Sequence, residues 1–491
     1  MEHGVTHPTR YHGEGEGSIV VRVILLPDLS HLQSSEQFAV ELLIDLSRLV
    51  PVGTAEVPVV RLVVEEDGRG GERRPVAEWV KGSWGIQVGD GEIRIPRGAL
   101  EAITAVAGVT AEQETDARDR HGRVPPDRNA LVAAGLERSP VVSAAGQALG
   151  AAARRAAGRR PLRFLAPWPG GRRWAVALTH DLDVVRWWPA FTALRLSELI
   201  RRGEWPRAAR VLAAVPGAVG RRPVARALGA LIEAEAARDV SSTWFVLCGT
   251  PTIATMAAGD LTYHPEAAFT RQLLAAIARA RGEISLHGSF ETYLSTPTFV
   301  AQRERLGGLI DEDVTGVRQH FLRLRPGATQ RAMAAAGFAY DASVGFPDRN
   351  GFRQGLADIT PLWDQETGRP LGIDEVPVVW MDRALSKYRG NEDPDVWVAD
   401  GIELADACRA VEGLWVGVWH PNLTPALGFP GAPQAYARLL DALLERTPYV
   451  GRVGELVQWR RRRRHARVDH LGADGAPRVL SGGDAVELDP A

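Results

Sequence analysis

Short apolar runs alternate with amphipathic segments along the chain after residue 170. Strands of a buried parallel sheet are apolar on both faces, so these runs predict such strands and the amphipathic segments predict covering helices. Arg271–Ala280 is one such helix, because its large apolar residues fall on one face. The pattern therefore predicts an α/β fold built from strand–helix units. The predicted strands are Trp174–Leu178, Thr243–Leu247, Glu283–Leu286, Val314–Val317, Val376–Trp380 and Leu414–Trp419.

The N-terminal part of the chain has a different pattern. Residues 1–17 are polar and predict a loose leader. Residues 18–160 predict a smaller α+β domain, because apolar strand-like runs flank a helical segment at Glu36–Leu49. Residues 159–171 contain the Pro and Gly punctuation of a linker, after which the α/β region is expected to occupy residues 170–460.

Two Arg-rich segments interrupt or follow the α/β region. Residues 192–238 predict a long helical insertion between the first two strands. Residues 461–491 are expected to form an Arg-rich C-terminal tail. The consecutive arginines of Arg460–Arg464 favour a solvated helix end over a contact with an anionic lipid or nucleic acid.

Composition and charge exclude several classes of protein. Hydrophobic residues make up 45% of the chain and charged residues 24%, which is typical of a globular protein and excludes extensive disorder. The formal net charge of −2 argues against a nucleic-acid partner. The two cysteines cannot form a disulfide framework or a cysteine-rich metal site. No apolar run is long enough for a transmembrane segment and no secretory signal is evident, so we expect a cytoplasmic location and infer no oligomeric state.

Residues whose side chains could take part in catalysis or metal binding follow several of the predicted strands. Because the carboxyl ends of parallel strands open onto one face of a barrel, we expect these side chains to converge there. Paired carboxylates suit a divalent metal or a general base, and histidines suit metal ligation or proton transfer. Each residue alone is also compatible with a structural role in a loop cap, a local hydrogen bond or an ion pair. The residues are Asp181, Asp183, His287, Arg318, His320 and His420.

Taken in order, these segments resemble the motifs of the NodB-type polysaccharide deacetylases, a family of carbohydrate esterases. The resemblance covers about residues 170–460 and implies a distorted (β/α) barrel that removes N-acetyl groups with a bound metal. Gly351-Phe352-Arg353 is similar to a segment of a subgroup that has an added N-terminal domain and is associated with bacterial surface polysaccharides. The matching segments are Thr179–Asp183, His287–Glu291, Gly316–His320, Tyr340–Ser343 and Val418–His420.

The resemblance implies a divalent metal, zinc in the first place with cobalt, nickel or manganese as alternatives. Asp183 and His287 would hold it, although Leu182 separates the two aspartates that are usually adjacent. Glu291 stands where the family has its second metal-binding histidine, so the third ligand is either Glu291 or His320. We favour His320, because it preserves a ligand set of two histidines and one aspartate.

Amide hydrolysis requires an activated water and a proton for the leaving amine. By the resemblance, Asp181 would act as the general base and Arg318 would orient its carboxylate and keep it ionised. His420 would act as the general acid, with Asp341 holding its imidazole in the charged form. The expected substrate is an amino sugar or glycan that carries an N-acetyl group.

Two other functions remain compatible with the sequence. The Asp-x-Asp pair of Asp181 and Asp183 also occurs in metal-dependent glycosyltransferases, but that function leaves His287 and His420 unexplained. Glu291 in the place of a metal-binding histidine is compatible with a catalytically degenerate barrel that binds glycan.

Overall fold

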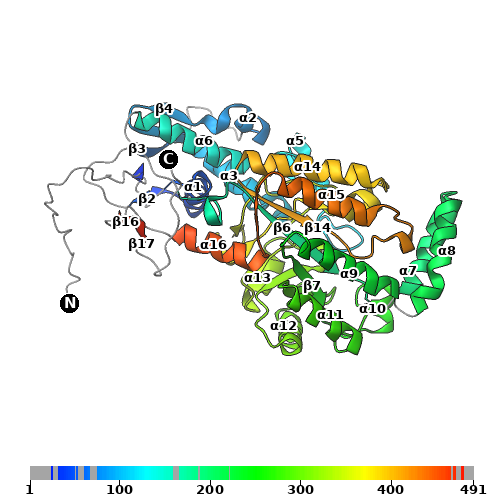
Figure 1. The fold of residues 1–491 in the computed structure, drawn as a ribbon. Coiled ribbons are helices and arrows are strands. Elements are labelled where there is room, and N and C mark those ends of the chain that lie inside the picture. The colour runs from blue at the N-terminus through cyan, green and yellow to red at the C-terminus, as the bar shows by residue number, and fades with distance from the viewer. Residues whose placement is uncertain are drawn as a thin grey trace.

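The computed structural model describes residues 24–25, 31–49, 51–52, 60–66, 74–158, 165–185, 188–219, 222–465, 468–471 and 477–479. The predicted leader and the first half of the predicted linker lie outside the described residues. Two sheets organise the described chain, a five-stranded one near the N-terminus and a ten-stranded one after residue 170 (Figure 1).

The ten-stranded sheet is centred on β6 (Ala175–Leu182), whose eight residues are all buried. Its strand order is β11-β12-β10-β9-β8-β7-β6-β14-β13, and β15 pairs with β6. All its pairings are parallel except the one between β11 and β12. The expected α/β fold with a curled parallel sheet is confirmed. The other strands are β7 (Thr243–Leu247), β8 (Glu283–Gly288), β9 (Gly316–Gln319), β10 (Tyr340–Asp341), β11 (Thr360–Asp364), β12 (Arg369–Glu375), β13 (Trp380–Met381), β14 (Leu414–Val418) and β15 (Tyr449–Val450).

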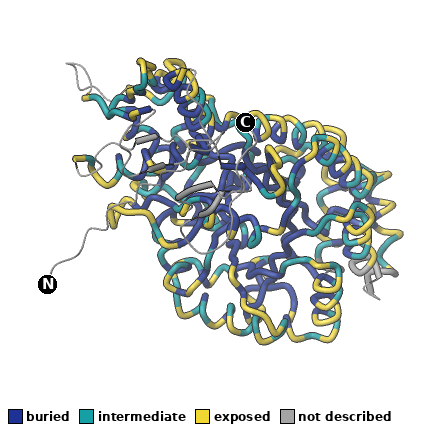
Figure 2. The backbone as a smooth tube through the Cα atoms, turned by 60° about the vertical axis from the view of Figure 1, so that its left-hand side comes forward, coloured by how far each residue is buried: buried dark blue, intermediate teal, exposed yellow. Residues whose placement is uncertain are grey.

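Amphipathic helices surround this sheet and bury their apolar faces against it. Figure 2 shows buried residues gathered in the interior and exposed ones on the outside. In α11 (Ala268–Arg279), for example, Leu273, Leu274 and Ile277 are buried in the core. None of the helices in the described residues is long and apolar enough to cross a membrane. The other helices of this layer are α10 (Ile253–Ala257), α12 (Thr296–Ile310), α13 (Ala328–Ala335), α14 (Pro394–Ala410) and α15 (Ala432–Leu444).

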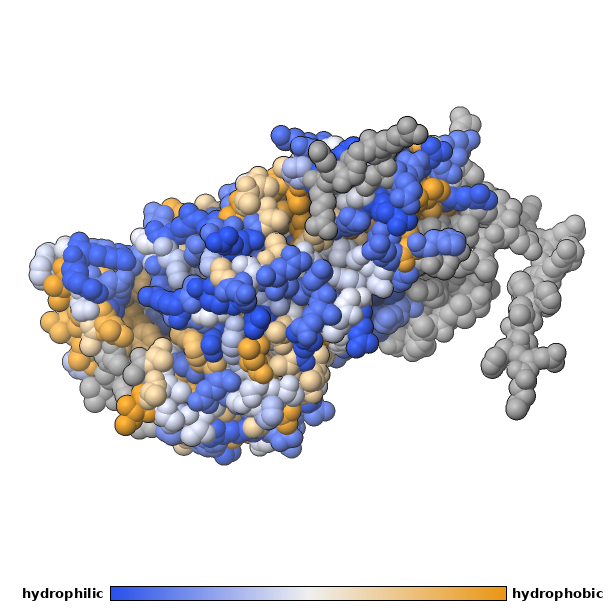
Figure 3. All heavy atoms as spheres, turned by 180° about the vertical axis from the view of Figure 1, so that it is seen from behind, coloured by the Kyte–Doolittle hydropathy of each residue, from blue (hydrophilic) through white to orange (hydrophobic). Residues whose placement is uncertain are grey.

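The predicted insertion forms three helices, α7 (Trp188–Arg201), α8 (Trp205–Val219) and α9 (Arg222–Ala236). Helices α7 and α8 lie at one end of the molecule, and α9 lies nearer the large sheet (Figure 1). Hydrophobic surface gathers at this end, at the left of Figure 3. Its exposed large apolar side chains on α7 and α8 are Leu194, Ile200, Trp205 and Leu212.

The N-terminal sheet has the order β2-β1-β3-β5-β4, and only β4 runs antiparallel to its neighbour. Helices pack against this sheet around a core of their own. The elements are β1 (Ile24–Leu25), α1 (Ser34–Ser47), β2 (Pro51–Val52), β3 (Val60–Glu65), α2 (Val76–Lys81), β4 (Gln87–Gly89), β5 (Glu92–Pro96), α3 (Arg97–Ala107), α4 (Thr110–Glu114), α5 (Ala130–Ala134) and α6 (Val141–Ala157).

The segment Gly351–Arg353 joins the N-terminal region to the larger sheet. Arg353 is buried, and its Nε donates to both carboxylate oxygens of Glu112 at 3.1 Å. Gly351 has a φ of 144°, and a Cβ there would lie 2.3 Å from the carbonyl oxygen of Glu137. Only glycine fits this close approach, so the segment has a structural role between the two parts of the chain.

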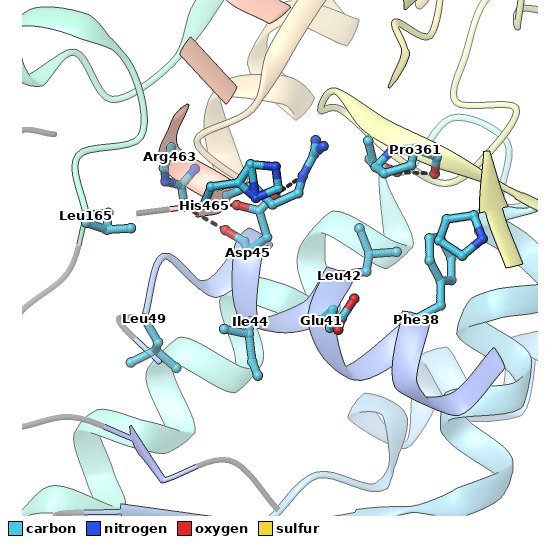
Figure 4. Close-up of a pocket in the computed structure, with 13 residues that line it drawn as sticks. Phe38, Glu41, Leu42, Ile44, Asp45, Leu49, Leu165, Pro361, Arg463 and His465 are labelled. Atoms are coloured by element: carbon cyan, nitrogen blue, oxygen red, sulfur yellow. Dashed lines mark hydrogen bonds and ion pairs between the residues drawn. The ribbon is translucent and has the colours of Figure 1, made fainter. Parts of the chain in front are cut away.

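The arginine run is not the solvated helix end that we expected. It lies within α16 (Val453–His465), and Arg460 is fully buried. Arg460 Nη2 lies 3.1 Å from Asp45 Oδ2 and 3.0 Å from Asp358 Oδ2. Figure 4 shows Arg463 facing Asp45 of α1 beside a cavity of about 260 Å³. The run therefore ties the C-terminal helix to the N-terminal region, and β16 (Val468–Leu471) and β17 (Pro477–Val479) follow it.

Replacing Arg460 by Ala should lower the free energy of unfolding by about 3–5 kcal/mol, because the buried Asp358 would lose the guanidinium that pairs with it and keep an uncompensated charge. Denaturant unfolding measures this change. Arg462→Ala is the matched control, since Arg462 is exposed on the same helix, and it should change stability by less than ~0.5 kcal/mol. Equal effects of the two substitutions would contradict the buried ion-pair role of Arg460.

Candidate active site

The chemically promising residues lie at the carboxyl edge of neighbouring strands. Asp181 belongs to β6, and Asp183 is the first residue after the end of that strand. His287 is the next-to-last residue of β8 and pairs in register with Arg318 of β9, which is adjacent in the sheet. His420 follows β14, which pairs with β6 on the other side. The parallel register therefore brings these side chains to one opening.

Asp183, His287 and His320 form a group that could hold a metal ion, with ligand atoms within 4.8 Å of one another. Asp183 Oδ1 lies 3.2 Å from His287 Nε2 and 3.5 Å from His320 Nε2. Tetrahedral zinc bound at about 2.0–2.2 Å separates its ligand atoms by roughly 3.3 Å, so the group has a suitable size. Glu291 is exposed and does not belong to this group.

Both histidines are oriented by a second hydrogen bond. His287 Nδ1 lies 2.9 Å from the carbonyl oxygen of Arg318, and His320 Nδ1 lies 2.8 Å from Asp260 Oδ1. Each Nε2 is therefore left to face Asp183, which is the arrangement that metal-binding histidines usually have. Burial by itself would raise the pKa of Asp183, but the neighbouring histidines, His320 foremost, hold that pKa below its usual range. The donor set thus fits a divalent metal.

Asp181 has a different environment from Asp183. Its Oδ1 accepts a hydrogen bond of 2.7 Å from Nη1 of the fully buried Arg318. The same nitrogen donates to Thr179 at 2.9 Å, and Arg318 Nε donates to the Ala342 carbonyl at 2.8 Å. Burial raises the pKa of Asp181, but the Arg318 guanidinium outweighs it and keeps that pKa below its ordinary value. Asp181 is therefore a fixed, ionised carboxylate.

His420 faces both aspartates from the opposite side of the opening. Its Nε2 lies 3.7 Å from Asp183 Oδ2 and 4.0 Å from Asp181 Oδ2. Its Nδ1 lies 2.6 Å from Asp382 Oδ1, and its backbone N–H donates to the other oxygen of Asp382 at 2.6 Å. Burial lowers the pKa of His420, but Asp382 in the first place raises it above the ordinary value. The protonated imidazole is thus favoured.

The expected pairing of His420 with Asp341 is corrected by this geometry. Asp341 instead accepts hydrogen bonds from Ser343 N–H at 2.9 Å and from Gln330 Nε2 at 3.3 Å. The reason is strand order: β10, which carries Asp341, lies beyond β9, whereas β13 is the direct neighbour of β14. Burial raises the pKa of Asp341 to about 7. Asp341 supports the sheet next to Arg318 and does not contact the imidazole.

Sequence reasoning missed two aspartates that hold the site histidines. Asp382 directly follows the short strand β13, so the same strand-end signal that marked His420 could have found it. Asp260 lies in a loop between α10 and α11 and belongs to no recognisable motif. Only its position against His320 reveals its role.

Comparisons with known proteins found similar folds and no sequence relative. No protein-family model matches the chain, and no curated protein matches it. Among solved structures it resembles a putative polysaccharide deacetylase from Mycobacterium smegmatis, with 22% identity and a TM-score of 0.39 over 60% of this chain and 92% of that one. It also resembles a probable polysaccharide deacetylase from Pseudomonas aeruginosa, with 14% identity and a TM-score of 0.41 over 62% of this chain and 96% of that one. A third similar structure is an allantoinase, with 15% identity and a TM-score of 0.40 over 61% of this chain and 94% of that one.

Proposed function

We propose that this protein is a metal-dependent hydrolase that removes the N-acetyl group from an amino sugar of a glycan or glycoconjugate. One observation carries the proposal: a potential metal-ligand group, a carboxylate held by arginine and a histidine backed by aspartate face the same opening. These are the three functions that amide hydrolysis needs. The motif resemblance points to the same reaction.

Asp183, His287 and His320 would hold the metal. When bound, a divalent ion supplies carbonyl polarisation and makes water more acidic. Asp181 accepts the proton of the attacking water at its carboxylate, whose ionised form Arg318 maintains. His420 donates its Nε2 proton to the nitrogen of the breaking C–N bond. Acetate and a free amine leave, and the site then returns to its starting protonation state by passing the proton from Asp181 to His420.

The geometry also bears on the glycosyltransferase alternative. An Asp-x-Asp site would use both carboxylates on one metal–nucleotide complex, yet Asp181 is committed to Arg318 at 2.7 Å while Asp183 faces the two histidines. The two aspartates thus have different nearest partners, although His287 and His420 lie near both. This difference favours a hydrolase with a distinct base and metal ligand.

The proposed function is tested by metal analysis together with acetate release from N-acetyl sugars. The purified protein should contain about one divalent ion per chain and should release acetate in a chelator-sensitive way. His320→Ala should lose most of the metal and of the acetate release, because it removes one of the three proposed ligands. A chain that binds glycan but releases no acetate when metal is added would instead support the degenerate barrel.

Glu291→Ala is the matched control for His320→Ala. Because Glu291 is exposed and outside the ligand group, this variant should retain its metal. If Glu291→Ala loses the metal and His320→Ala keeps it, our assignment of the third ligand is contradicted.

A further inference from the structure

One wall of the candidate catalytic cavity is cationic. Arg123, Arg383 and Lys387 line the same cavity of about 100 Å³ as Asp183 and His420. Arg123 comes from the N-terminal region, so that region contributes directly to this wall. A cavity with surplus positive charge beside a reaction centre predicts a negatively charged group on the substrate.

Arg123 is already occupied by protein partners. Its Nε donates to Asp119 Oδ2 at 2.8 Å, and its Nη1 donates to the Phe321 carbonyl at 3.0 Å and to Tyr388 Oη at 3.2 Å. Arg123 therefore stabilises this wall through contacts within the protein. Its donors are used by these partners and are not counted toward substrate binding.

The side chains of Arg383 and Lys387 have N–H donors that the described residues do not use. Among the residues that the structure describes, neither forms an ion pair or a hydrogen bond, and Lys387 Nζ contacts only aromatic rings, 5.7 Å from the centroid of Phe321. Arg383 lowers the pKa of Glu198 through space, but Glu198 forms its ion pair with Arg195 at 2.7 Å. Within the described residues neither cation is therefore paired with a carboxylate, and Asp183 acts on Lys387 only through space.

The two cations come from the chain segment that also holds His420 and line the same cavity. Arg383 directly follows Asp382, which holds His420, and Lys387 lies on the next turn, η6 (Ala384–Tyr388). In the proposed reaction His420 protonates the nitrogen that stays on the sugar. Because the acetyl group carries no anionic substituent, a negative charge that meets these cations must belong to the sugar part of the substrate.

We propose that Arg383 and Lys387 form an oxyanion-binding subsite for a phosphate or carboxylate group carried by the amino sugar. This inference rests on the proposed function and names its substrate class. Guanidinium and ammonium groups bind such oxyanions through charge-assisted hydrogen bonds. Desolvation and the nearby guanidinium groups of Arg383 and Arg123 lower the pKa of Lys387 to about 8, so an anion would relieve this mutual repulsion.

The test compares acetate release from three sugars: the methyl glycoside of N-acetylglucosamine, its phosphate monoester and the corresponding uronic acid. The wild-type protein should prefer at least one anionic sugar by about 10- to 100-fold in kcat/KM, the expected worth of one or two charged hydrogen bonds. Arg383→Gln/Lys387→Met should lose this preference, mainly through a higher KM. The favoured anion identifies phosphate or carboxylate as the natural group.

Arg389→Gln is the matched control, because Arg389 lies just after the same turn, lines a different cavity and donates to the Asp348 carbonyl at 3.2 Å. It should keep the anion preference. Equal kcat/KM for neutral and anionic sugars in the wild type, or an unchanged preference in the double variant, would overturn the subsite.

Calorimetric binding of the phosphate monoester separates this inference from the proposed function. If no sugar releases acetate but the wild type binds the ester about tenfold more tightly than the double variant, the subsite stands and the deacetylase function falls. If the two bind it equally, the subsite falls as well.

Discussion

Replacing Asp181 by Asn should lower the turnover of an N-acetyl sugar about 10²- to 10⁴-fold while the protein keeps its metal, because the variant loses the general base but no ligand. Asp181 is bound by Arg318, and its Oδ2 lies 3.8 Å from His287 Nε2, farther than the 3.2 Å between that nitrogen and Asp183. Steady-state kinetics and metal analysis of the same preparation measure the two effects.

Asp183→Ala is the companion variant. Its carboxylate lies 3.2 Å from His287 Nε2 and 3.5 Å from His320 Nε2, so its removal should strip the metal and activity together. If the two variants lose metal to the same extent, the assignment of separate roles to these two aspartates is wrong.

His420→Ala should lower the hydrolysis of N-acetyl sugars about 10²- to 10⁴-fold, because the amine then leaves without a proton from the general acid. An activated phenyl acetate, whose leaving group needs little protonation, should be affected much less. Comparing the two substrates separates proton donation from a loss of binding or folding. Equal losses on both would remove the acid role.

Asp382→Asn tests the group behind that imidazole. Since the Asp382 carboxylate raises the pKa of His420, its neutral replacement should lower that pKa. The protonated acid form would then be lost at a lower pH, so the alkaline limb of the rate profile should move to lower pH. Asp341→Asn should leave this limb in place, because Asp341 bonds to Ser343 and Gln330 and not to His420.

Much of the site could be predicted from local sequence patterns. Apolar runs that end in Asp or His indicated both the strands and the side chains at their carboxyl ends, because strand burial and strand-end chemistry are properties of a few consecutive residues. The approach of His320 to Asp183 at 3.5 Å follows from that logic. The aspartate that pairs with His420 could not be predicted in this way, because neither Asp341 nor Asp382 is near His420 in the chain.

The sequence by itself determined the α/β class, the order of the strands along the chain and the residues offered at the opening, since these depend on local hydrophobic patterns. The tertiary structure alone decided the order of strands within the sheet, which places Asp382 and not Asp341 beside His420. It also decided that Arg460 is buried against Asp45, 415 positions away in the chain. Such pairings arise when distant elements pack together, and a charged side chain carries no local mark of a partner that is far away in the chain.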